Sequence, residues 1–394
     1  MWPRVEYETY RWNRDEEDLL LIPKSRRRKI TSSYEAAVPA PISSLPVEVP
    51  AELARRAAEA CAVAIRFDQA QVGRGYDLPA LMLRSESSSS SQIERLTSSV
   101  RNVALAELSD KAPENAKLIA GNVAAMREVL EQGGPVDVVS LCQVHDVLMA
   151  GTGEAKGLRE EQMWIGGTPY SPHGASFVPP HVSRLTACLG DLVSFGGRED
   201  LSPVVKAAVF HAQFETIHPF TDGNGRTGRA LLHRMLARDE VLPHATLPLS
   251  AGLLHDVDSY MEALAVYHDG QVEPIIERVV SALELSVVVG ARIASDVDVV
   301  LARWREATKE RKGSAAHRLP ALLVEQPVVS VAYVAEKLEI SERAARSLVE
   351  VACERGILSR MGNARRGAFY QASDLIEILE EASSTQGIRR MAAR

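Results

Sequence analysis

The side chains best suited to chemistry lie in one stretch, HPFTDGNGRTGR, from His218 to Arg229. Its glycines let successive backbone N–H groups turn inward into an anion-binding cradle. Arginines are planar, permanently charged forks that suit phosphate oxygens. A carboxylate beside a bound anion is repulsive unless a divalent cation joins them, and Mg²⁺ is the usual choice for phosphates. A neutral imidazole beside a magnesium polyphosphate can take the proton of an attacking hydroxyl.

We therefore predict nucleotide chemistry at phosphorus, with His218 as the base and Asp222 as the Mg²⁺ ligand. The cradle and the forks would come from Gly223, Gly225, Arg226 and Arg229.

Two other interpretations of this stretch stay open. A glycine-rich turn with a solvated histidine would leave the aspartate, the asparagine and both arginines unexplained. Alternatively, His211, Glu215 and His218 share one helical face at spacing i, i+4 and i+7, and they could ligate a metal as in a hydrolase. That interpretation leaves the glycines and arginines without a role, so we favour phosphate chemistry.

Two helices should position the stretch. The first begins with Ser202 as the N-cap and Pro203 at the first helical position. Pro219 disfavours helical backbone at His218, so this helix should end there with the imidazole facing the loop. The second should begin near Thr227 and direct the positive end of its dipole at a bound anion. Upstream, QMWIGGTPYSPHGASFVPP has short β-branched and aromatic pieces around Gly and Pro, which predicts a hairpin or an ordered loop.

Composition limits the class of protein. With 394 residues the chain is long enough for more than one domain, and its formal charge of -7 argues against general coating of nucleic acid. The four cysteines are scattered without a CxxC pair, which favours reduced thiols in a cytoplasmic protein. The charged N-terminus does not resemble a signal peptide, and the most apolar stretch is too polar to span a bilayer. We expect no membrane partner.

HPFTDGNGRTGR resembles the signature of the Fic family, His-Pro-Phe-x-Asp/Glu-Gly-Asn-Gly-Arg-x-x-Arg, at every fixed position. The resemblance extends over about residues 90–285. It includes LREEQMWIGG…FVPP, which looks like the family's flap, and YMEALAVYHDGQVEPII, which looks like its last core helices. Family members are mostly α-helical enzymes, and most transfer AMP from ATP to a Tyr, Thr or Ser hydroxyl of a target protein, releasing pyrophosphate. The resemblance thus implies ATP as substrate, Mg²⁺ and a protein target.

The resemblance also assigns roles within the signature. His218 would deprotonate the target hydroxyl, Phe220 would anchor the core and Asp222 would hold Mg²⁺. Arg226 would stabilise charge at the transferring phosphate, and Arg229 would bind the γ-phosphate. The α- and β-phosphates would lie on Gly223, Asn224 and Gly225, with Gly228 as a further nucleotide-binding position.

Outside the signature, the resemblance implies further contacts. Residues of the flap would edge the site, and the hairpin behind them would hold the target's backbone by strand addition. Tyr260 matches an aromatic residue near the adenine pocket and is equally well placed as a core residue. The flap residues are Ile165, Gly166, Gly167 and Thr168.

The serine run SESSSSSQ before the core has two interpretations. Ser91 and Glu94 form a Ser-x-x-Glu capping box, which predicts that the serines are a loop leading into a new helix. In the Fic family, many members carry an inhibitory helix with the pattern Ser/Thr-x-x-x-Glu-Gly/Asn. Ser90 and Glu94 match it, and Arg95 departs from it. The resemblance implies that Glu94 pairs with Arg229 and blocks a productive γ-phosphate position, and we favour this inhibitory role.

The C-terminal part resembles a winged helix, from VSVAYVAEKLEI to ASDLIEIL. Ser341 would cap the recognition-like helix. Arg343 and Arg346 could face DNA, and ARRGAFYQ would form a wing with Arg365 and Arg366 at its tip. Acidic residues interleave with these arginines, and winged helices also dock proteins. A DNA partner and a protein partner both stay open.

We therefore expect a mainly α protein with a Fic helical core, a β-hairpin flap and a C-terminal winged helix-turn-helix domain. The N-terminal region should be irregular to about residue 50 and helical after it. The expected divisions are 1–89 for the N-terminal region, 90–285 for the core, 286–317 for a linker helix and 318–385 for the winged helix, with an inhibitory helix at 90–100, the flap at 163–180 and the motif at 218–229.

The expected activity is AMPylation of a target protein docked on the flap, autoinhibited by Glu94. The alternatives are removal of AMP, another phosphate-ester transfer on the same core, and a DNA-binding regulator in which the Fic core is a sensor. A homo-oligomer is left open.

Overall fold

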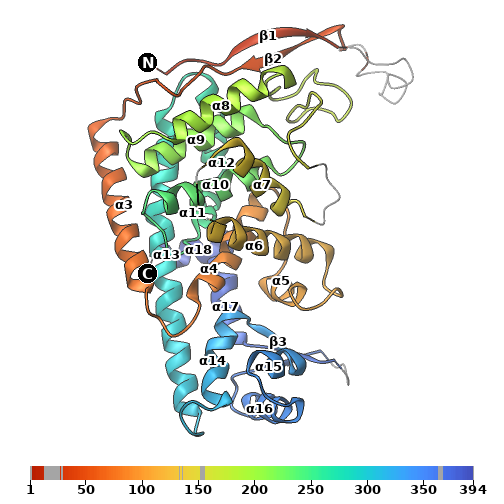
Figure 1. Cartoon of the computed structure of the whole chain (residues 1–394), viewed down its shortest axis with the longest axis vertical. Coiled ribbons are helices and arrows are strands. Elements are labelled where there is room, and N and C mark those ends of the chain that lie inside the picture. The colour runs from red at the N-terminus through yellow and green to blue at the C-terminus, as the bar shows by residue number, and fades with distance from the viewer. Residues whose placement is uncertain are drawn as a thin grey trace.

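The computed structural model describes residues 2–12, 27, 30–132, 134, 136–150, 156–362 and 367–393. The molecule is mainly helical, as the sequence predicts. A two-stranded ribbon lies at one end and residues 315–361 lie at the other (Figure 1). No helix among these residues is long and apolar enough to cross a membrane.

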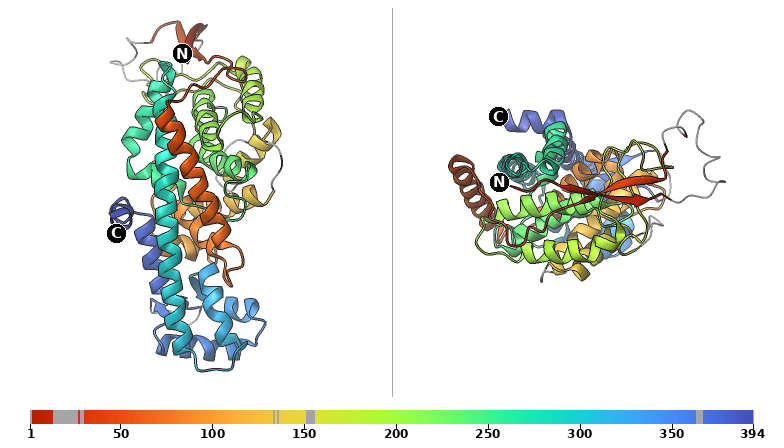
Figure 2. Two further views of the ribbon diagram at one scale, coloured as in Figure 1. Left: turned by 90° about the vertical axis from the view of Figure 1, so that its left-hand side faces the viewer. Right: turned by 90° about the horizontal axis from the view of Figure 1, so that it is seen from above.

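The longest helix, α13 (Glu273–Ala307), runs along the length of the molecule (Figure 1). Its buried residues recur every three or four positions, which places them on one helical face. Helix α3 (Ala51–Gln71) lies beside it and contacts it (Figure 2). The helix predicted at 286–317 is therefore not a separate linker helix. Residues 286–307 are the second half of α13, because its apolar face continues without a break.

The helices around the site follow one another along the chain. They are α5 (Val100–Ala106), α6 (Glu114–Gln132), α7 (Val138–Leu148), the short 3-10 helix η1 (Val182–Arg184), α8 (Leu185–Gly196), α9 (Pro203–Ile217), α10 (Asn224–Arg238), α11 (Leu249–His255) and α12 (Val257–His268). Ser202 is the N-cap of α9 and Pro203 its first residue, as predicted, although the Ser202 side chain makes no capping hydrogen bond.

The N-terminal segment was predicted to be irregular to about residue 50. It instead contains two strands. β1 (Glu6–Arg11) pairs antiparallel with β2 (Ser33–Val38), with Glu6 opposite Val38 and Arg11 opposite Ser33. On its other side β2 reaches the flap, because the Ala37 N–H donates to the Val178 carbonyl over 2.9 Å. This long-range pairing stabilises strands that neither segment would form alone.

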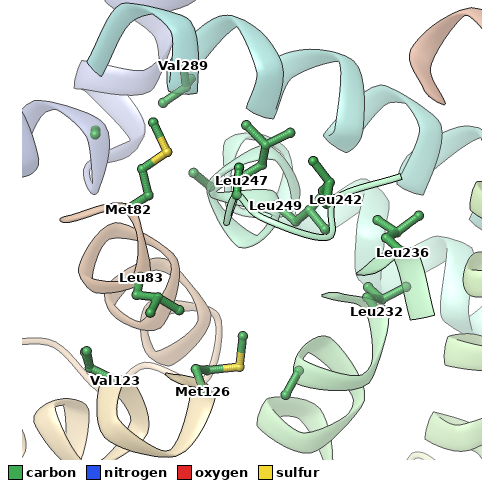
Figure 3. Close-up of a cluster of buried hydrophobic side chains, with 14 of the residues drawn as sticks. Met82, Leu83, Val123, Met126, Leu232, Leu236, Leu242, Leu247, Leu249 and Val289 are labelled. Carbon is green, nitrogen blue, oxygen red and sulfur yellow. The ribbon is translucent and has the colours of Figure 1, made fainter. Parts of the chain in front are cut away.

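The serine run lies inside helix α4 (Leu78–Ile93), not in a loop. Asp77 caps this helix by accepting from Ala80 N, and the serines from Ser85 to Ser91 are buried. Small side chains let α6 and α11 approach closely, and the Ser91 hydroxyl accepts from Nδ2 of Asn122, on α6, over 3.2 Å. Figure 3 shows side chains of α4 and α6 near those around α11 and from α13, among them Met82, Leu83, Val123, Met126, Leu247, Leu249 and Val289.

Helix α4 ends where a new helix was predicted. Glu94 is its C-cap, and Arg95 follows in the left-handed conformation with φ 63°. Arg95 N donates to Gln92 O over 2.8 Å and Leu96 N donates to Ser91 O over 2.9 Å, which is the pattern of a Schellman motif. Neither the capping box at Ser91 nor an inhibitory helix over 90–100 is present. The Ser90–Glu94 pattern instead occupies the last turn of α4.

The C-terminal part combines helices with a three-stranded antiparallel sheet, in which β5 (Phe369–Gln371) lies between β3 (Val328–Ser330) and β4 (Ser359–Met361). As predicted, Ser341 caps α16 by accepting from Ala344 N, and Arg343 and Arg346 are exposed on that helix. Arg365 and Arg366 lie outside the described residues. The elements are α14 (Ala315–Glu325), β3 (Val328–Ser330), α15 (Val331–Lys337), α16 (Glu342–Glu354), β4 (Ser359–Met361), β5 (Phe369–Gln371), α17 (Ser373–Ala382) and α18 (Thr385–Ala393).

The end of α17 forms hydrogen bonds with α4, the buried helix that contains the serine run. Ser85 Oγ donates to the Ala382 carbonyl over 3.2 Å, and Gln92 Nε2 donates to the Ser383 carbonyl over 2.7 Å. Helices α14 and α17 both contact α4. The C-terminal part therefore packs directly on the helix that ends at Glu94.

Candidate active site

The turn between α9 and α10 begins with strained backbone at His218. His218 is the C-cap of α9 with φ 49° and ψ 63°, a left-handed conformation. Pro219 excludes a continued helix, as predicted, and the turn is closed by His218 N donating to Phe214 O over 2.9 Å. A left-handed residue other than glycine costs free energy that its surroundings must offset.

Helix α10 begins at Asn224 and not near Thr227 as predicted. The earlier start has a visible cause in the Asn224 side chain, which is buried. Its Oδ1 accepts from Phe220 N over 2.9 Å and its Nδ2 donates to Phe220 O over 2.8 Å. Asn224 thereby fixes the loop against the first turn of α10, so its side chain supports the anion-binding turn from behind.

The three glycines of the signature are required by close approaches. Gly223 has φ 73°, and a Cβ there would meet Met149 Sδ at 2.6 Å. A Cβ on Gly225 would lie 2.5 Å from Oε1 of Glu94, and one on Gly228 would lie 2.6 Å from Oε1 of Glu215. Gly225 and Gly228 thus leave room for carboxylates at the start of α10, and Gly223 leaves room for the Met149 side chain.

Phe220 is fully buried, in agreement with its predicted role as a core anchor. His145 stacks on it with ring centroids 3.8 Å apart. Burial lowers the pKa of His145, and Nε2 of the neutral ring donates to the Asp222 carbonyl over 3.1 Å. His145 could not be predicted from the sequence, because no local pattern distinguishes it from other helical histidines.

The imidazole of His218 is suited to act as a base. Its Nδ1 donates to the Glu215 carbonyl over 3.2 Å, which leaves Nε2 unprotonated in the neutral ring. Burial lowers the pKa of His218 to about 4, so the ring is neutral near pH 7. The nearby Glu215 carboxyl has a pKa raised by burial to about 7.

Both arginines of the signature bind one carboxylate, that of Glu94. Arg229 Nη2 donates to Glu94 Oε1 over 2.6 Å, and Arg226 Nε donates to Glu94 Oε2 over 3.0 Å. Arg229 also donates to the Ser90 hydroxyl over 2.8 Å and to the Ser90 carbonyl over 3.0 Å. The predicted contact of Glu94 with Arg229 is therefore present, and the contact with Arg226 is an addition.

A cavity of about 730 Å³ lies beside these groups. One part of its wall is polar and includes Glu94, His218, Asp222 and Arg229, together with the start of α10. Another part is apolar and comes from Ile93, Met163, Phe177, Met261, Leu264 and Ala265. Such a division suits a ligand with a charged end and an apolar, planar end.

The structure brings most predicted site residues to this cavity. Ile165, His218, Asp222, Gly223, Asn224, Gly225, Arg229 and Tyr260 line it, as does Glu94. The predicted residues Gly166, Gly167, Thr168, Arg226, Gly228 and Ser90 are not part of its wall. Gly228 faces Glu215 instead, and the Arg226 side chain is held between Glu94 and Asp222.

The flap has the backbone pairing of a short hairpin without regular strands. Ile165 N donates to Phe177 O and Ser176 N donates to Ile165 O, each over 2.8 Å. Thr168 pairs with Ser171 in an isolated bridge. Gly166 and Gly167, with φ 74° and 73°, make the bend between these pairs. Its exposed residue Ile165 lies at the cavity.

The alternative metal set from α9 is not supported. His211 Nε2 lies 2.7 Å from the Tyr260 hydroxyl, and both residues are buried. Within the described ranges, no group of three His, Cys, Asp or Glu side chains could hold a metal by itself. Asp222 fits a different kind of site. Its carboxylate is exposed at the cavity, where Mg²⁺ could bind it together with phosphates and water.

Comparison with known proteins agrees with this geometry. Residues 135–236 match the model of the Fic/DOC family. The chain is 34% identical over 99 residues to the probable protein adenylyltransferase aq_aa38 of Aquifex aeolicus, covering 25% of this chain and 29% of that protein. It is 30% identical over 135 residues to the protein adenylyltransferase fic-1 of Caenorhabditis elegans, covering 34% and 24%. The matched part thus spans less than a third of these curated relatives.

The fold also has a counterpart among solved structures. A Fic family protein from Desulfovibrio desulfuricans G20 aligns with a TM-score of 0.54 at 20% identity, covering 83% of this chain and 97% of that one. This likeness concerns the fold alone. The match to the family model places a Fic/DOC-family domain at residues 135–236 of this chain.

Proposed function

We propose that the protein transfers AMP from ATP to a Tyr, Thr or Ser hydroxyl of a target protein. The observation that carries this proposal is one cavity shared by a neutral His218, the guanidinium of Arg229 and an apolar wall of a kind that suits adenine. The curated relatives named protein adenylyltransferase support the same activity.

In the proposed reaction, Nε2 of His218 takes the proton of the target hydroxyl, and the hydroxyl oxygen attacks the α-phosphorus. The bond from that phosphorus to the oxygen bridging the α- and β-phosphates breaks, and pyrophosphate leaves. Backbone N–H groups at the start of α10 and the helix dipole stabilise the phosphates. Bound Mg²⁺ would neutralise charge on the pyrophosphate, and Asp222 is the carboxylate suited to hold it.

We further propose that Glu94 inhibits this reaction. Its Oε1 lies 2.5 Å from the position of a Cβ on Gly225, directly at the N-terminus of α10. A helix N-terminus with two arginines is a site for an anion, and the carboxylate occupies it. The γ-phosphate of ATP then loses Arg229 as a partner and meets like charge.

The remaining parts of the proposal concern partners and setting. The target would dock on the flap by strand addition beside Ile165. The C-terminal part would act as a winged helix that binds either DNA or a protein. All four cysteines are free thiols, which supports a reducing, cytoplasmic setting.

The test is incubation of the protein with labelled ATP and Mg²⁺ in cell extract, followed by mass spectrometry of the modified proteins. We expect AMP on hydroxyl side chains, and its loss when His218 is replaced. Transfer of another phosphate ester, or release of AMP from a modified protein without transfer, would contradict the proposed direction.

A further inference from the structure

Arg159 is buried between the catalytic turn and the flap, and it belongs to neither the signature nor the cavity wall. Its side chain is 5% exposed. Nε donates to the His218 carbonyl over 2.9 Å, and Nη1 donates to the Glu161 carbonyl over 3.2 Å. Nη2 donates to the Pro180 carbonyl, and the backbone N–H donates to the Pro219 carbonyl over 3.0 Å. Its side-chain partners are thus three backbone carbonyls.

The carbonyls bound by Arg159 belong to two parts of the site, the flap and the end of α9. Glu161 and Pro180 lie at the two ends of the flap, so Nη1 and Nη2 close the base of that segment. Nε and the backbone N–H bind His218 and Pro219, the residues at which α9 ends. One planar guanidinium therefore joins the base-bearing turn to both ends of the flap.

We propose that Arg159 is a positioning residue, which holds His218 and the flap in the one relative placement that brings base and target hydroxyl together. This inference rests on the proposed AMP transfer. The flap would hold the target's backbone, whereas His218 must take the proton of the target's side chain. A displacement of His218 relative to the flap would therefore separate the imidazole from the target hydroxyl. Displacement by about 1 Å can lower a rate by about a hundredfold.

The chemistry of arginine explains why this residue suits the position. Its N–H groups diverge in a fixed plane and reach three acceptors at once, whereas the single ammonium of lysine cannot reproduce that fork. Among the described residues, no carboxylate forms an ion pair with Arg159, so its charge is balanced by carbonyl dipoles. His218 has a left-handed conformation, which is unfavourable for a residue other than glycine. The hydrogen bond from Nε of Arg159 to the His218 carbonyl helps to stabilise that conformation.

The charge of Arg159 also acts on the base. Burial is the main cause of the low pKa of His218, the Glu215 carbonyl opposes it through its hydrogen bond, and Arg159 lowers that pKa further, whereas Asp222 raises it. The Glu215 carboxylate lies 3.9 Å from Nδ1 of His218. Arg159 thus helps to keep the imidazole neutral while it fixes the backbone.

The test compares Arg159→Lys, Arg159→Ala and a matched control, Arg238→Lys. Arg238 is an exposed arginine whose Nη1 donates to the Gly196 carbonyl over 3.3 Å, outside the site. Hydrogen–deuterium exchange is measured over residues 161–180 and 217–223 in the full chain. AMP transfer is measured in the Glu94→Gly background, in which the proposed inhibition is absent.

We expect both Arg159 variants to exchange faster in these two segments than wild type, and Arg238→Lys to match wild type. In transfer, kcat should fall by about ten- to a hundredfold while KM for ATP changes little, because the phosphate contacts are intact. Methylguanidinium at millimolar concentration should restore part of kcat to Arg159→Ala and none to Arg159→Lys, in which the lysine side chain occupies the site.

The opposite results overturn the inference. Arg159→Lys with the exchange and kcat of the control would mean that the fork has no positioning role. An equal loss of ATP affinity and kcat without rescue would mean that Arg159 only supports the fold. If the Glu94→Gly protein with intact Arg159 transfers no AMP, the proposed function fails, whereas the exchange data still decide whether Arg159 fixes the turn to the flap.

Discussion

Glu94 and Arg229 meet across 135 residues of sequence, with Oε1 of Glu94 2.6 Å from Nη2 of Arg229. The same carboxylate binds Arg226, so one side chain at the end of α4 engages both arginines of the signature. The nucleotide site and the serine helix are therefore parts of one structural unit, and a change in either should be felt in the other.

Replacing Glu94 with Gly should raise auto-modification sharply, because Arg229 becomes free to bind the γ-phosphate. Without nucleotide, the variant should lose about 1–3 kcal/mol of stability, since two buried arginines lose their shared partner. ATP with Mg²⁺ should then raise the melting temperature of the variant more than that of wild type. Glu94→Gln, of the same size, is the control for charge. Equal transfer rates in all three proteins would remove the inhibitory role.

Replacing His218 with Ala should abolish transfer and leave ATP binding nearly unchanged, because the imidazole acts on the incoming hydroxyl. The pH profile is a second measurement. The folded pKa of about 4 lies below the ordinary value of 6.5, so the ring stays neutral as the pH falls through 6.5 and becomes protonated only near 4. Transfer should show no histidine-like decline at pH 6.5. Glu215→Gln serves as the control, because Glu215 has its own pKa near 7. A decline at 6.5 that persists in this variant would contradict the assignment.

Much of the site could be predicted from the sequence because its chemistry is local. The glycines, His218, Asp222 and the arginines lie within one turn and the helix after it, where residue type and spacing determine the backbone. The serine run could not be read this way. Its residues lack the apolar period of a buried helix, and its burial is explained by the helices packed around it, among them α6, α11, α14 and α17. Arg159 and His145 were missed because their partners are backbone carbonyls of segments distant in sequence.

Replacing Arg95 with Gly should stabilise the protein by roughly 1 kcal/mol, because Arg95 occupies a left-handed position that favours glycine. The Schellman motif would then hold the end of α4, and with it Glu94, more firmly. We expect lower auto-modification and weaker ATP binding in the variant with Gly, because Glu94 then occupies Arg229 for a larger fraction of the time. Glu339→Gly is the matched control, since Glu339 has φ 54° in the C-terminal part and should gain stability without any effect on transfer. Chemical denaturation and a transfer assay measure the two effects. A gain in activity for Arg95→Gly would refute the link between this cap and inhibition.

Asp222→Ala should remove the Mg²⁺ dependence of ATP binding, because this carboxylate is the one that would hold the cation beside the phosphates. Isothermal titration of ATP with and without Mg²⁺ measures this independently of turnover. The loss of the 3.3 Å contact with Arg226 is a small effect on stability, since the Asp222 side chain is largely exposed. Asp258→Ala, in the first turn of α12 and outside the cavity wall, is the control. Unaltered Mg²⁺ dependence in Asp222→Ala would exclude the metal role.

The C-terminal part contacts the last turn of α4. Gln92 lies two residues before Glu94, and its Nε2 donates to the Ser383 carbonyl over 2.7 Å. Without this contact, the last turn of α4 should fray more often, and Glu94 should leave the arginines for a larger fraction of the time.

Gln92→Ala should therefore raise auto-modification above wild type but below Glu94→Gly. Adding Gln92→Ala to Glu94→Gly should raise it no further, because the inhibitor is already gone. Gln71→Ala is the control, since Gln71 Nε2 donates to the Phe67 carbonyl within α3 and should leave transfer unchanged. If Gln92→Ala also accelerates the Glu94→Gly protein, Gln92 acts on the site by a route other than Glu94. If it changes neither protein, the C-terminal part supports α4 without controlling its end.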